Sequence, residues 1–390
     1  MLPFELSEYR TRLDKTKQRM ETRGIEVLLA TDPANMCYLT GYDGWSFYVH
    51  QMVILALDEE EPLWVGRGMD ANAAKITSYL QHANIHAYPD DYVQSTIKHP
   101  MDYVADLVKE KGWSKRVIGV EMDNYYFTAA CLESLKRNLP NAEIKDASAL
   151  VNWVRVIKSP HELVYISQAA LIAERAMRIG IDRIQPGIRQ CDAAAAIYQA
   201  LISGTEDFGG DYPGICPLLP TGVRTSTPHL TWTDKPFVRN ETTILELAGC
   251  RLRYHSPMAR TVHLGKPPAW LTHTAEVVAE GLNSTLTAMQ SGAICEDVEA
   301  VWRQTVEKQG IVKDSRIGYS VGLNYPPDWG EHTLSLRPGD KTVLQTNMTL
   351  HLMLGIWQDD RGYEISECVR VTEAGGETFA HFPGKLFLKD

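Results

Sequence analysis

A helix-start signal near the middle of the chain constrains its folding more than any other single feature. In "KSPHELVYISQAALIAERAMRIG", Ser159 can cap a helix, Pro160 suits the first helical position, and Glu162 stands three residues after the cap. The signal predicts a helix from about 160 to 180. It also predicts a domain boundary just before that helix, which divides the chain into residues 1–155 and 156–390.

The first 155 residues alternate between strand-like and helix-like segments. Short apolar runs bounded by polar residues predict buried strands, and the segments between them have helical patterns. Strands that alternate with helices are typical of a three-layer α/β domain. The strands are predicted at 25–30, 51–57, 62–67 and 116–122, and the helices at 15–23 and 69–81.

The second part of the chain groups its elements differently. Long helices come in blocks, and β-rich stretches follow in blocks of their own. Strands and helices in separate blocks predict an α+β domain with a strongly bent antiparallel sheet. Helices are predicted at about 160–180, 188–204, 271–291 and 295–309, and β-rich stretches at 235–249, 348–354 and 364–375.

Composition excludes some classes of partner. The 390 residues carry a formal net charge of −10, whereas a nucleic-acid binder needs a basic face for phosphate contacts. Seven scattered cysteines form no disulfide framework, which favours a reducing compartment. We find no signal-peptide core and no apolar run of about 18 residues. We therefore expect a cytoplasmic protein with no membrane and no nucleic-acid partner.

Six motifs in order over the second part resemble the pita-bread fold of methionine aminopeptidases, prolidases, aminopeptidase P and creatinase. The two-domain layout is similar to the prolidase and creatinase branch of that family. The resemblance implies a pita-bread α+β domain preceded by a smaller α/β domain. The motifs are "VRVIKSPHELVYISQAA", "GICPLLPTGVRTSTPHL", "ILELAGCRLRYHSPMART", "RIGYSVGLNYPPDWGE", "NMTLHLMLGIW" and "ISECVRVTEAG".

The metal ligands of that family are not matched here. The family uses two aspartates, one histidine and two glutamates, a hard-oxygen set that bridges two divalent ions. A proline, a thioether and a neutral phenol cannot hold such a pair. We therefore expect no metal and no other cofactor. The matching positions carry Glu246, Pro257, Tyr319, Met353 and either Ser366 or, shifted by one, Glu367.

A carboxylate and a histidine can still form a metal-free site. Glu246 lies in an apolar strand pattern, and His229 in "STPHLTW" matches the catalytic histidine of metal-free creatinase. Together they can provide acid–base or nucleophilic chemistry. The alternative for Glu246 is a structural carboxylate paired with Arg260 or Arg253, because a buried charge needs a partner.

Longer stretches narrow the resemblance to the ectoine hydrolases within that branch. Creatinase has a glutamate directly before its Arg-Thr pair, where this chain has Ala259, so creatine is a poor substrate prediction. The stretches are "LTGYDGWSFYVHQ", "HPMDYVADLV", "EMDNYYF", "FGGDYPGICPLLPTG", "PHLTW", "ELAGCRLRYHSPMARTVHLGKPP" and "YPPDWGE".

The resemblance implies a small cyclic amidine, ectoine or hydroxyectoine, as substrate. A site for its amidinium and carboxylate needs an anion, aromatic faces and a donor. Core packing is the alternative for each aromatic residue in the stretches. The residues predicted to bind substrate are Trp45, Phe47, Tyr212, Trp232, Tyr325 and Trp329.

The implied reaction opens the ring to N-acetyl-L-2,4-diaminobutyrate. Glu246 is predicted as nucleophile and His229 as proton shuttle, with Tyr319 and Glu367 placing a nitrogen or the water. The alternatives are Glu246 as general base, a creatinase-like hydrolase of another amidine or guanidino acid, and a binding module without turnover. Relatives in the branch imply a homodimer whose N-terminal domain reaches the neighbour's pocket.

Overall fold

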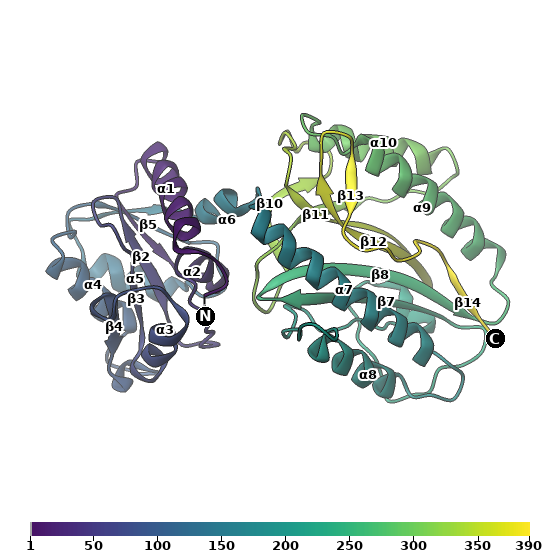
Figure 1. Cartoon of the computed structure of the whole chain (residues 1–390), viewed down its shortest axis with the longest axis horizontal. Coiled ribbons are helices and arrows are strands. Elements are labelled where there is room, and N and C mark those ends of the chain that lie inside the picture. Colours follow the sequence, from purple (N-terminus) through teal and green to yellow (C-terminus); the bar gives the residue numbers. More distant parts are fainter. Residues whose placement is uncertain (1) are drawn as a thin grey trace. The chain divides into compact units, whose positions relative to one another are not determined.

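The structure is a computed structural model, and it describes residues 2–390 of the chain. The chain forms two compact units, Met1–Arg155 and Val156–Asp390 (Figure 1). Each unit has its own sheet and its own helices.

The first unit is built on a six-stranded sheet of order β4-β3-β2-β1-β5-β6. Strand β2 runs antiparallel to β1 and β3, and the other neighbouring pairs are parallel. The central strand β1 is an unbroken apolar run that is buried along its whole length, as expected for a sheet covered on both faces. The strands are β1 (Val27–Ala30), β2 (Met52–Ala56), β3 (Leu63–Arg67), β4 (Ile85–Tyr88), β5 (Val117–Val120) and β6 (Glu143–Asp146).

Helices pack on this sheet in two groups. Helices α4 and α5 pack together against Val27 and Leu29 of β1, while α1 contacts α2 and α6. Successive strand residues point to opposite faces, and Leu28 and Ala30 are buried as well. The three-layer prediction is confirmed. The helices are α1 (Leu6–Thr22), α2 (Pro33–Thr40), α3 (Ala71–Thr77), α4 (Pro100–Glu110), α5 (Ala129–Asn138) and α6 (Leu150–Arg155), with 3₁₀ turns η1 (Gly68–Asp70), η2 (His82–Asn84) and η3 (Asp90–Tyr92).

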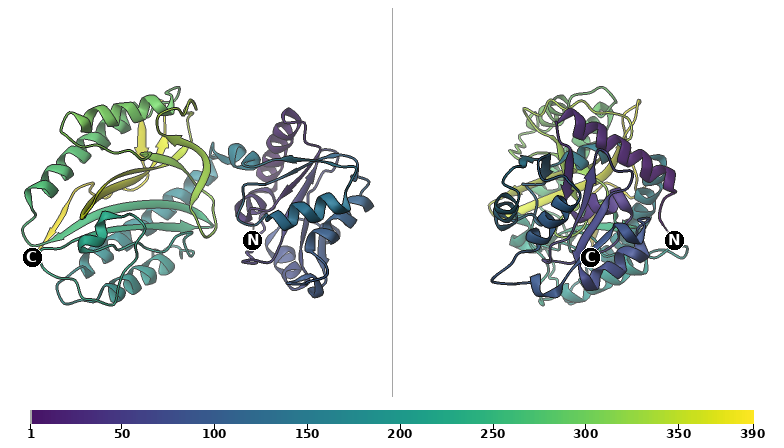
Figure 2. Two further views of the ribbon diagram at one scale, coloured as in Figure 1. Left: turned by 180° about the vertical axis from the view of Figure 1, so that it is seen from behind. Right: turned by 90° about the vertical axis from the view of Figure 1, so that its left-hand side faces the viewer.

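The second unit holds an eight-stranded, strongly curved sheet (Figures 1 and 2). Two long hairpins, β7/β8 and β11/β12, form its centre, and β12 pairs with β8. The sheet is antiparallel except that β14 runs parallel to β8. The strands are β7 (Thr242–Arg251), β8 (Tyr254–Leu264), β9 (Gly318–Val321), β10 (Gly330–Leu336), β11 (Thr349–Gln358), β12 (Arg361–Val371), β13 (Gly376–Thr378) and β14 (Phe387–Lys389).

Four long helices cover this sheet. Helix α7 lies along β7 and β8, and α9 contacts α10, β12 and β13. Gly249 permits the close approach of α7, because a Cβ there would lie 1.9 Å from the carbonyl oxygen of Ala169. The capping box predicted at Ser159 and Glu162 is present at the start of α7. The helices are α7 (Pro160–Arg183), α8 (Gln190–Ser203), α9 (Ala269–Ala288) and α10 (Cys295–Glu307), with a 3₁₀ turn η4 (Gly222–Ser226).

The strand register places one row of side chains across four strands. Glu246 of β7 lies opposite Ala259 of β8, which lies opposite Ser366 of β12, which lies opposite Met353 of β11. Residues directly opposite each other in a sheet point to the same face. The row therefore brings residues more than 100 positions apart in sequence to one surface.

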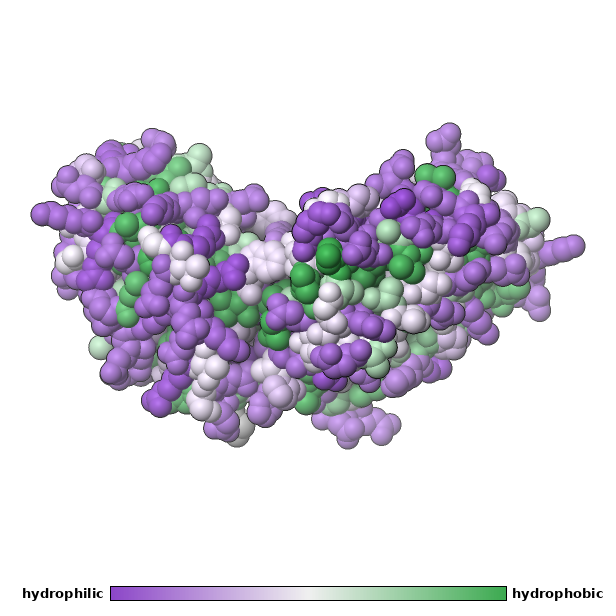
Figure 3. Space-filling view, turned by 90° about the horizontal axis from the view of Figure 1, so that it is seen from above, coloured by the Kyte–Doolittle hydropathy of each residue, from purple (hydrophilic) through white to green (hydrophobic). Residues whose placement is uncertain are grey.

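Hydrophilic residues dominate the face drawn in Figure 3, and the hydrophobic residues there form separate groups among them. This is ordinary for a surface in contact with water. Within residues 2–390, no helix combines the length and the apolar character needed to cross a membrane.

Candidate active site

The side chain of Glu246 lines a cavity of about 710 Å³ in the second unit. Backbone hydrogen bonds between Glu246 and Leu218 (2.8 and 3.1 Å) hold the 215–218 segment beside β7, where it forms one wall. His229, which follows η4, lines the same cavity, so the structure brings the predicted pair to one place. The cavity-lining residues are Ile215, Cys216, Leu218, Pro228, His229, Thr231, Glu246, Ser315, Arg316, Tyr319, Pro327, Asp328, Trp329, Met353 and Trp357.

Among residues 2–390, no arginine forms an ion pair with Glu246. Arg260 forms an ion pair with Glu367 (2.5 Å), and Arg253 stacks on the ring of Tyr212, 4.1 Å from its centroid. Burial, with the charge of Glu364 in addition, raises the pKa of Glu246 well above its ordinary value. A buried carboxylate without a cationic partner, in contact with a cavity, points to a functional rather than a structural role.

A chain of neutral polar groups lies beside this carboxylate. Trp329 Nε1 donates to the Tyr319 hydroxyl (2.8 Å), which lies 2.9 Å from Nδ1 of His351. Nε2 of His351 is 2.7 Å from Ser366 Oγ and 3.9 Å from Glu246 Oε1. Because indole only donates, the Tyr319 hydrogen is free for Nδ1, which leaves the His351 hydrogen on Nε2 facing Ser366.

Burial also fixes the charge state of these hydrogen-bonded side chains. It lowers the pKa of His351 to about 3 and raises the pKa of Tyr319, so both side chains are neutral over the physiological range. His351 is not among the site residues predicted from the sequence. Its signal was available, because it precedes Met353 by two positions and therefore points to the same face of β11.

A second buried carboxylate, Glu364, was also missed. It lies two residues from Ser366 on the same face of β12, opposite Gly355. Burial raises the pKa of Glu364 to about 7, and nearby Lys313 counteracts this. Burial lowers the pKa of Lys313 to about 8, and its ammonium group donates to the carbonyl oxygen of Gly355 (2.8 Å). Two coupled carboxylates in such a place favour a cationic ligand or a shared proton.

Glu367 does not belong to this group. It is adjacent to Ser366, so its side chain points to the opposite face of β12. There it pairs with Arg260, whose guanidinium group also donates to the carbonyl oxygens of Pro383 and Phe382. The prediction of Glu367 as an active-site residue is corrected to a structural ion pair, and Ser366 takes the place in the row.

The residues on this face do not suit the two metal ions that are bound by the family the six motifs resemble. The face offers a carboxylate at Glu246, a hydroxyl at Ser366, a thioether at Met353 and a phenol at Tyr319, while Pro257 has no donor side chain. The phenol and the hydroxyl are already engaged with His351. Glu246 and Glu364 are two carboxylates, whereas the set that bridges two hard divalent ions has two aspartates, two glutamates and a histidine, so this face supplies fewer anionic oxygens than such a pair needs.

The predicted aromatic residues are dispersed. Of the six, Trp329 alone lines the cavity, and Trp357 is a lining aromatic that the sequence analysis missed. Tyr325 is buried and flanks Arg253 together with Tyr212, so neither contributes to the wall.

The prediction that Trp232 binds substrate is also corrected, because this side chain packs on Tyr198 at the edge of the core. Trp45 and Phe47 stack on each other in the first unit, with ring centroids 4.8 Å apart, and their role in binding stays a prediction.

Two charged side chains in the wall were not predicted. Arg316 donates to Ser335 Oγ (3.1 Å), and its guanidinium group lies 4.4 Å from the ring centroid of Tyr319. Asp328 accepts from the backbone N–H groups of Trp329 and Gly330 and lies 2.6 Å from His332 Nε2. Arg316 can bind an anion at the cavity wall, because its planar group presents several donors.

Comparisons with known proteins agree with this architecture. Residues 164–373 match the model of metallopeptidase family M24, and residues 12–157 match the creatinase/prolidase N-terminal domain. Ectoine hydrolase of Halomonas elongata is 47% identical over 100% of this chain and 99% of its own length. An uncharacterized hydrolase/peptidase of Sinorhizobium fredii, y4tM, is 42% identical over the full length of both chains.

A solved structure shares the fold. The prolidase from Thermococcus sibiricus superposes with a TM-score of 0.84 at 19% identity, over 97% of this chain and 99% of that one. Both the two-unit layout and the curved sheet of the second unit are therefore a known architecture.

Proposed function

We propose that this chain, which belongs to metallopeptidase family M24 and also has a creatinase/prolidase N-terminal domain, opens the ring of ectoine. The observation that carries the proposal is the 47% identity to ectoine hydrolase over the whole chain. A hydrolase without the family's metals is supported by the side chains at the matched ligand positions, where Glu246 is a carboxylate and Pro257, Tyr319, Met353 and Ser366 are not.

The charges of the cavity support an amidinium carboxylate as substrate. Glu246, with Glu364 close by, favours a cation at the floor of the cavity, and a bound amidinium stabilises the ionised form of Glu246. Arg316 at the wall is suited to the substrate carboxylate. Trp329 and Trp357 provide flat faces for the ring.

The proposed reaction proceeds through a covalent adduct. A carboxylate oxygen of Glu246 forms a bond to the amidinium carbon, and the π electrons of the C=N bond move to a ring nitrogen. Protonated His229 gives its proton to that nitrogen as the C–N bond breaks with its electron pair on nitrogen. The lone pair of the other nitrogen then forms a C=N bond to the carbon, and the ring opens. His229 removes a proton from water, whose oxygen adds to the same carbon while the C=N π electrons return to the remaining nitrogen. The bond to Glu246 breaks as the new hydroxyl gives its proton to the released amine, which leaves an acetyl amide and an ammonium group.

The product of this sequence is N-acetyl-2,4-diaminobutyrate, with one water consumed and both enzyme groups restored. The amidinium carbon is already electrophilic, so a Lewis acid is not required. Tyr319, His351 and Ser366 hold fixed orientations beside the reacting carboxylate through their mutual hydrogen bonds.

A general base is the competing role for Glu246, and its raised pKa favours that role, because a base works best when its pKa lies near the working pH. Single turnover in heavy-oxygen water separates the two. A substrate-mass adduct trapped on the Glu246 peptide in the His229→Ala variant supports the nucleophile with water attack on the substrate carbon. Label in the Glu246 carboxylate supports a nucleophile whose adduct water hydrolyses at the carboxyl carbon instead. With neither found while Glu246→Gln is inactive, Glu246 acts as base.

The substrate is tested by proton NMR of purified protein with ectoine, creatine and a Xaa-Pro dipeptide. We expect ectoine alone to be opened, with an acetyl signal for the product. Ectoine that binds without conversion would establish a binding module. Faster hydrolysis of creatine would establish a creatinase-like enzyme for guanidino acids, and either result would overturn the proposal.

A further inference from the structure

Three side chains that can bind a metal converge in the first unit, far along the sequence from one another. His50 precedes β2, His99 caps α4, and Cys131 lies in the first turn of α5. One ligand atom from each residue lies within 4.8 Å of the others, and Cys131 Sγ is 3.7 and 3.8 Å from the two ring nitrogens of His50. In a tetrahedral zinc site the ligand atoms are about 3.3–3.7 Å apart.

We propose that His50, His99 and Cys131 form a binding site for a zinc-class divalent metal ion. Two imidazoles and a thiolate are the donors that zinc prefers, and they do not suit magnesium or calcium. This site is separate from the cavity of the second unit and is independent of the function proposed there.

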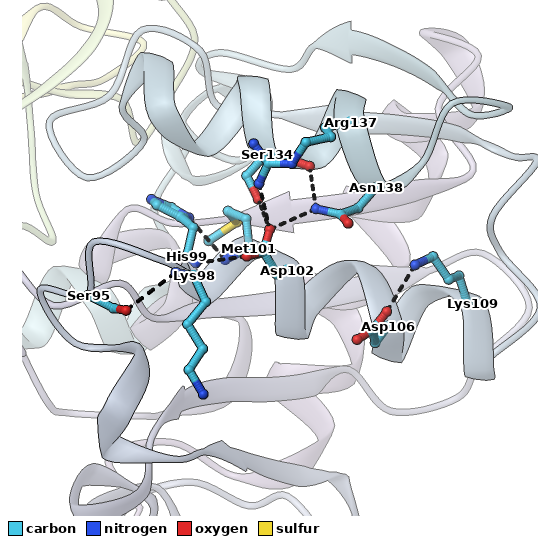
Figure 4. Close-up of polar contacts among 10 residues, drawn as sticks. All are labelled: Ser95, Lys98, His99, Met101, Asp102, Asp106, Lys109, Ser134, Arg137 and Asn138. Carbon is cyan, nitrogen blue, oxygen red and sulfur yellow. Dashed lines mark hydrogen bonds and ion pairs between the residues drawn. The ribbon is translucent and has the colours of Figure 1, made fainter.

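A hydrogen-bond network sets the positions of two ligands in advance. Asp102 accepts from Ser134, Arg137 and Asn138 of α5 through Oδ1, at 2.6, 2.9 and 2.7 Å (Figure 4). Its Oδ2 accepts from the backbone N–H of His99 at 2.8 Å. The start of α4 is thereby tied to the helix that carries Cys131, which gives the pair a fixed separation.

The surroundings of His50 have the form expected of a metal ligand. Its Nδ1 lies 3.3 Å from the carbonyl oxygen of Tyr126, so a hydrogen on Nδ1 can point to that carbonyl and leave Nε2 as the acceptor nitrogen. Because Cys131 Sγ is almost equally far from both ring nitrogens, it lies over the ring, and the ring must turn for Nε2 to share a metal with Cys131. Burial lowers the pKa of both histidines, and neutral imidazole is the form that binds metal.

A fourth coordination position is available. A cavity of about 220 Å³ lies against His50 and His99, and it can hold a water or a small anion on the metal. Burial raises the pKa of the Cys131 thiol, and a bound dication counteracts this by favouring the thiolate. Metal binding would therefore release a proton.

Metal binding and the helix cap exclude each other at His99. Its Nδ1 now accepts from the backbone N–H of Met101 (3.1 Å; Figure 4). A metal on Nδ1 takes that lone pair, and a metal on Nε2 requires a proton on Nδ1. Whichever nitrogen binds the metal, the Met101 amide loses its acceptor.

The binding test uses the full chain after removal of metals with a chelator. Zinc is titrated against a chromophoric chelator, and cobalt is used as a spectroscopic probe. We expect one ion per chain and a sulfur-to-cobalt charge-transfer absorption. Cys131→Ser should lose that absorption. Both Cys131→Ser and His50→Ala should weaken zinc binding by on the order of a hundredfold or more, which exceeds the effect of changing a residue that only contacts a ligand.

Two matched variants make the test specific. His99→Asn keeps a side chain that caps helices well but provides a poor ligand, and we expect it to fold normally and to lose the metal. His82→Ala removes an exposed histidine of the same unit and should bind zinc as wild type does. Zinc binding that persists in Cys131→Ser or His99→Asn, or no saturable binding by wild type, would overturn the proposal.

The exclusion at His99 gives a second readout. Hydrogen–deuterium exchange of the peptide around Met101 should become faster when zinc is added to wild type and should not respond in His99→Asn. Zinc bound at one equivalent without any change at the Met101 amide would remove His99 from the ligand set and contradict the site.

Discussion

The ionisation of Glu246 in the cavity depends on its burial and on a second buried carboxyl group, Glu364. The pKa of Glu246 is raised by burial and then by Glu364, whose own pKa is raised to about 7 by burial. Each carboxylate makes ionisation of the other less favourable, so the pair titrates as a unit. The chemistry proposed for Glu246, as nucleophile or base, needs its ionised form.

The pH dependence of kcat/KM follows from this pairing. As pH falls through the raised pKa of Glu246, the free enzyme loses the reactive carboxylate and kcat/KM for ectoine should fall about tenfold per pH unit. Glu364→Gln removes the negative neighbour, which lowers the pKa of Glu246 and should move the acid limb to lower pH. An acid limb at the same pH in both proteins would show that the two groups are not coupled.

Glu246→Gln should separate activity from stability. We expect the rate of ring opening to fall by roughly three or more orders of magnitude. Because the folded-state pKa of Glu246 is above its ordinary value of 4.5, the folded protein binds this proton more tightly than the unfolded chain does. The ionised Glu246 side chain therefore destabilises the folded wild-type protein. This destabilisation is absent at pH values below 4.5 and grows as pH rises.

The measurement is urea unfolding of both proteins at pH 4 and pH 8. The variant should be more stable than wild type at pH 8 and nearly equal to it at pH 4. A variant that is less stable at pH 8 would mean that Glu246 has a stabilising partner. Near-normal turnover would remove Glu246 from the mechanism.

In strand β12, two adjacent residues have different roles because their side chains point to opposite faces of the sheet. Ser366 faces the cavity side of the sheet, and its neighbour Glu367 faces the helices and Arg260. Sequence alone left these two residues as alternatives for one position. Only the pairing of β12 with β8 decides between them, because it is set by contacts between segments about 100 residues apart.

Glu367→Gln is expected to affect folding and leave catalysis intact. Removing the charge leaves Arg260 buried without its carboxylate, which should lower the free energy of unfolding by on the order of 3–5 kcal/mol. Below the melting transition, kcat and KM should remain near wild type. Glu377→Gln, which alters a solvent-exposed pair with Arg370, is the matched control and should change little. A large loss of kcat in folded Glu367→Gln would return Glu367 to the active site.

Local signals in the sequence were reliable where the physics is local. The capping box at Ser159 and Glu162 and the four long helices of the second unit were predicted near their observed bounds. Residues supplied by distant segments were not found. His351 and Glu364 lie two positions from Met353 and Ser366, so the two-residue period of a strand could have indicated them once the neighbouring positions were recognised. Arg316 lies outside the strands, and no local pattern indicates its place in the cavity wall.

At the scale of the whole molecule, the resemblance to the branch implies a homodimer in which Trp45 and Phe47 serve the neighbouring subunit. Trp45→Ala and Glu246→Gln should then each be inactive alone. When the two are mixed and their subunits exchanged, dimers with one intact site should form and restore about a quarter of wild-type activity. Sedimentation measures whether the protein is a dimer. If subunit exchange is demonstrated and no activity is recovered, the result contradicts sites shared between subunits.

The central claim is that this member of a metallopeptidase family opens ectoine without a metal in its cavity. The direct measurement is ring opening by NMR after exhaustive chelation, in wild type and in Cys131→Ser, which lacks the cluster proposed in the first unit. We predict that the rate in both proteins is essentially unchanged by chelation. A rate abolished in both and restored by manganese or zinc would contradict the account.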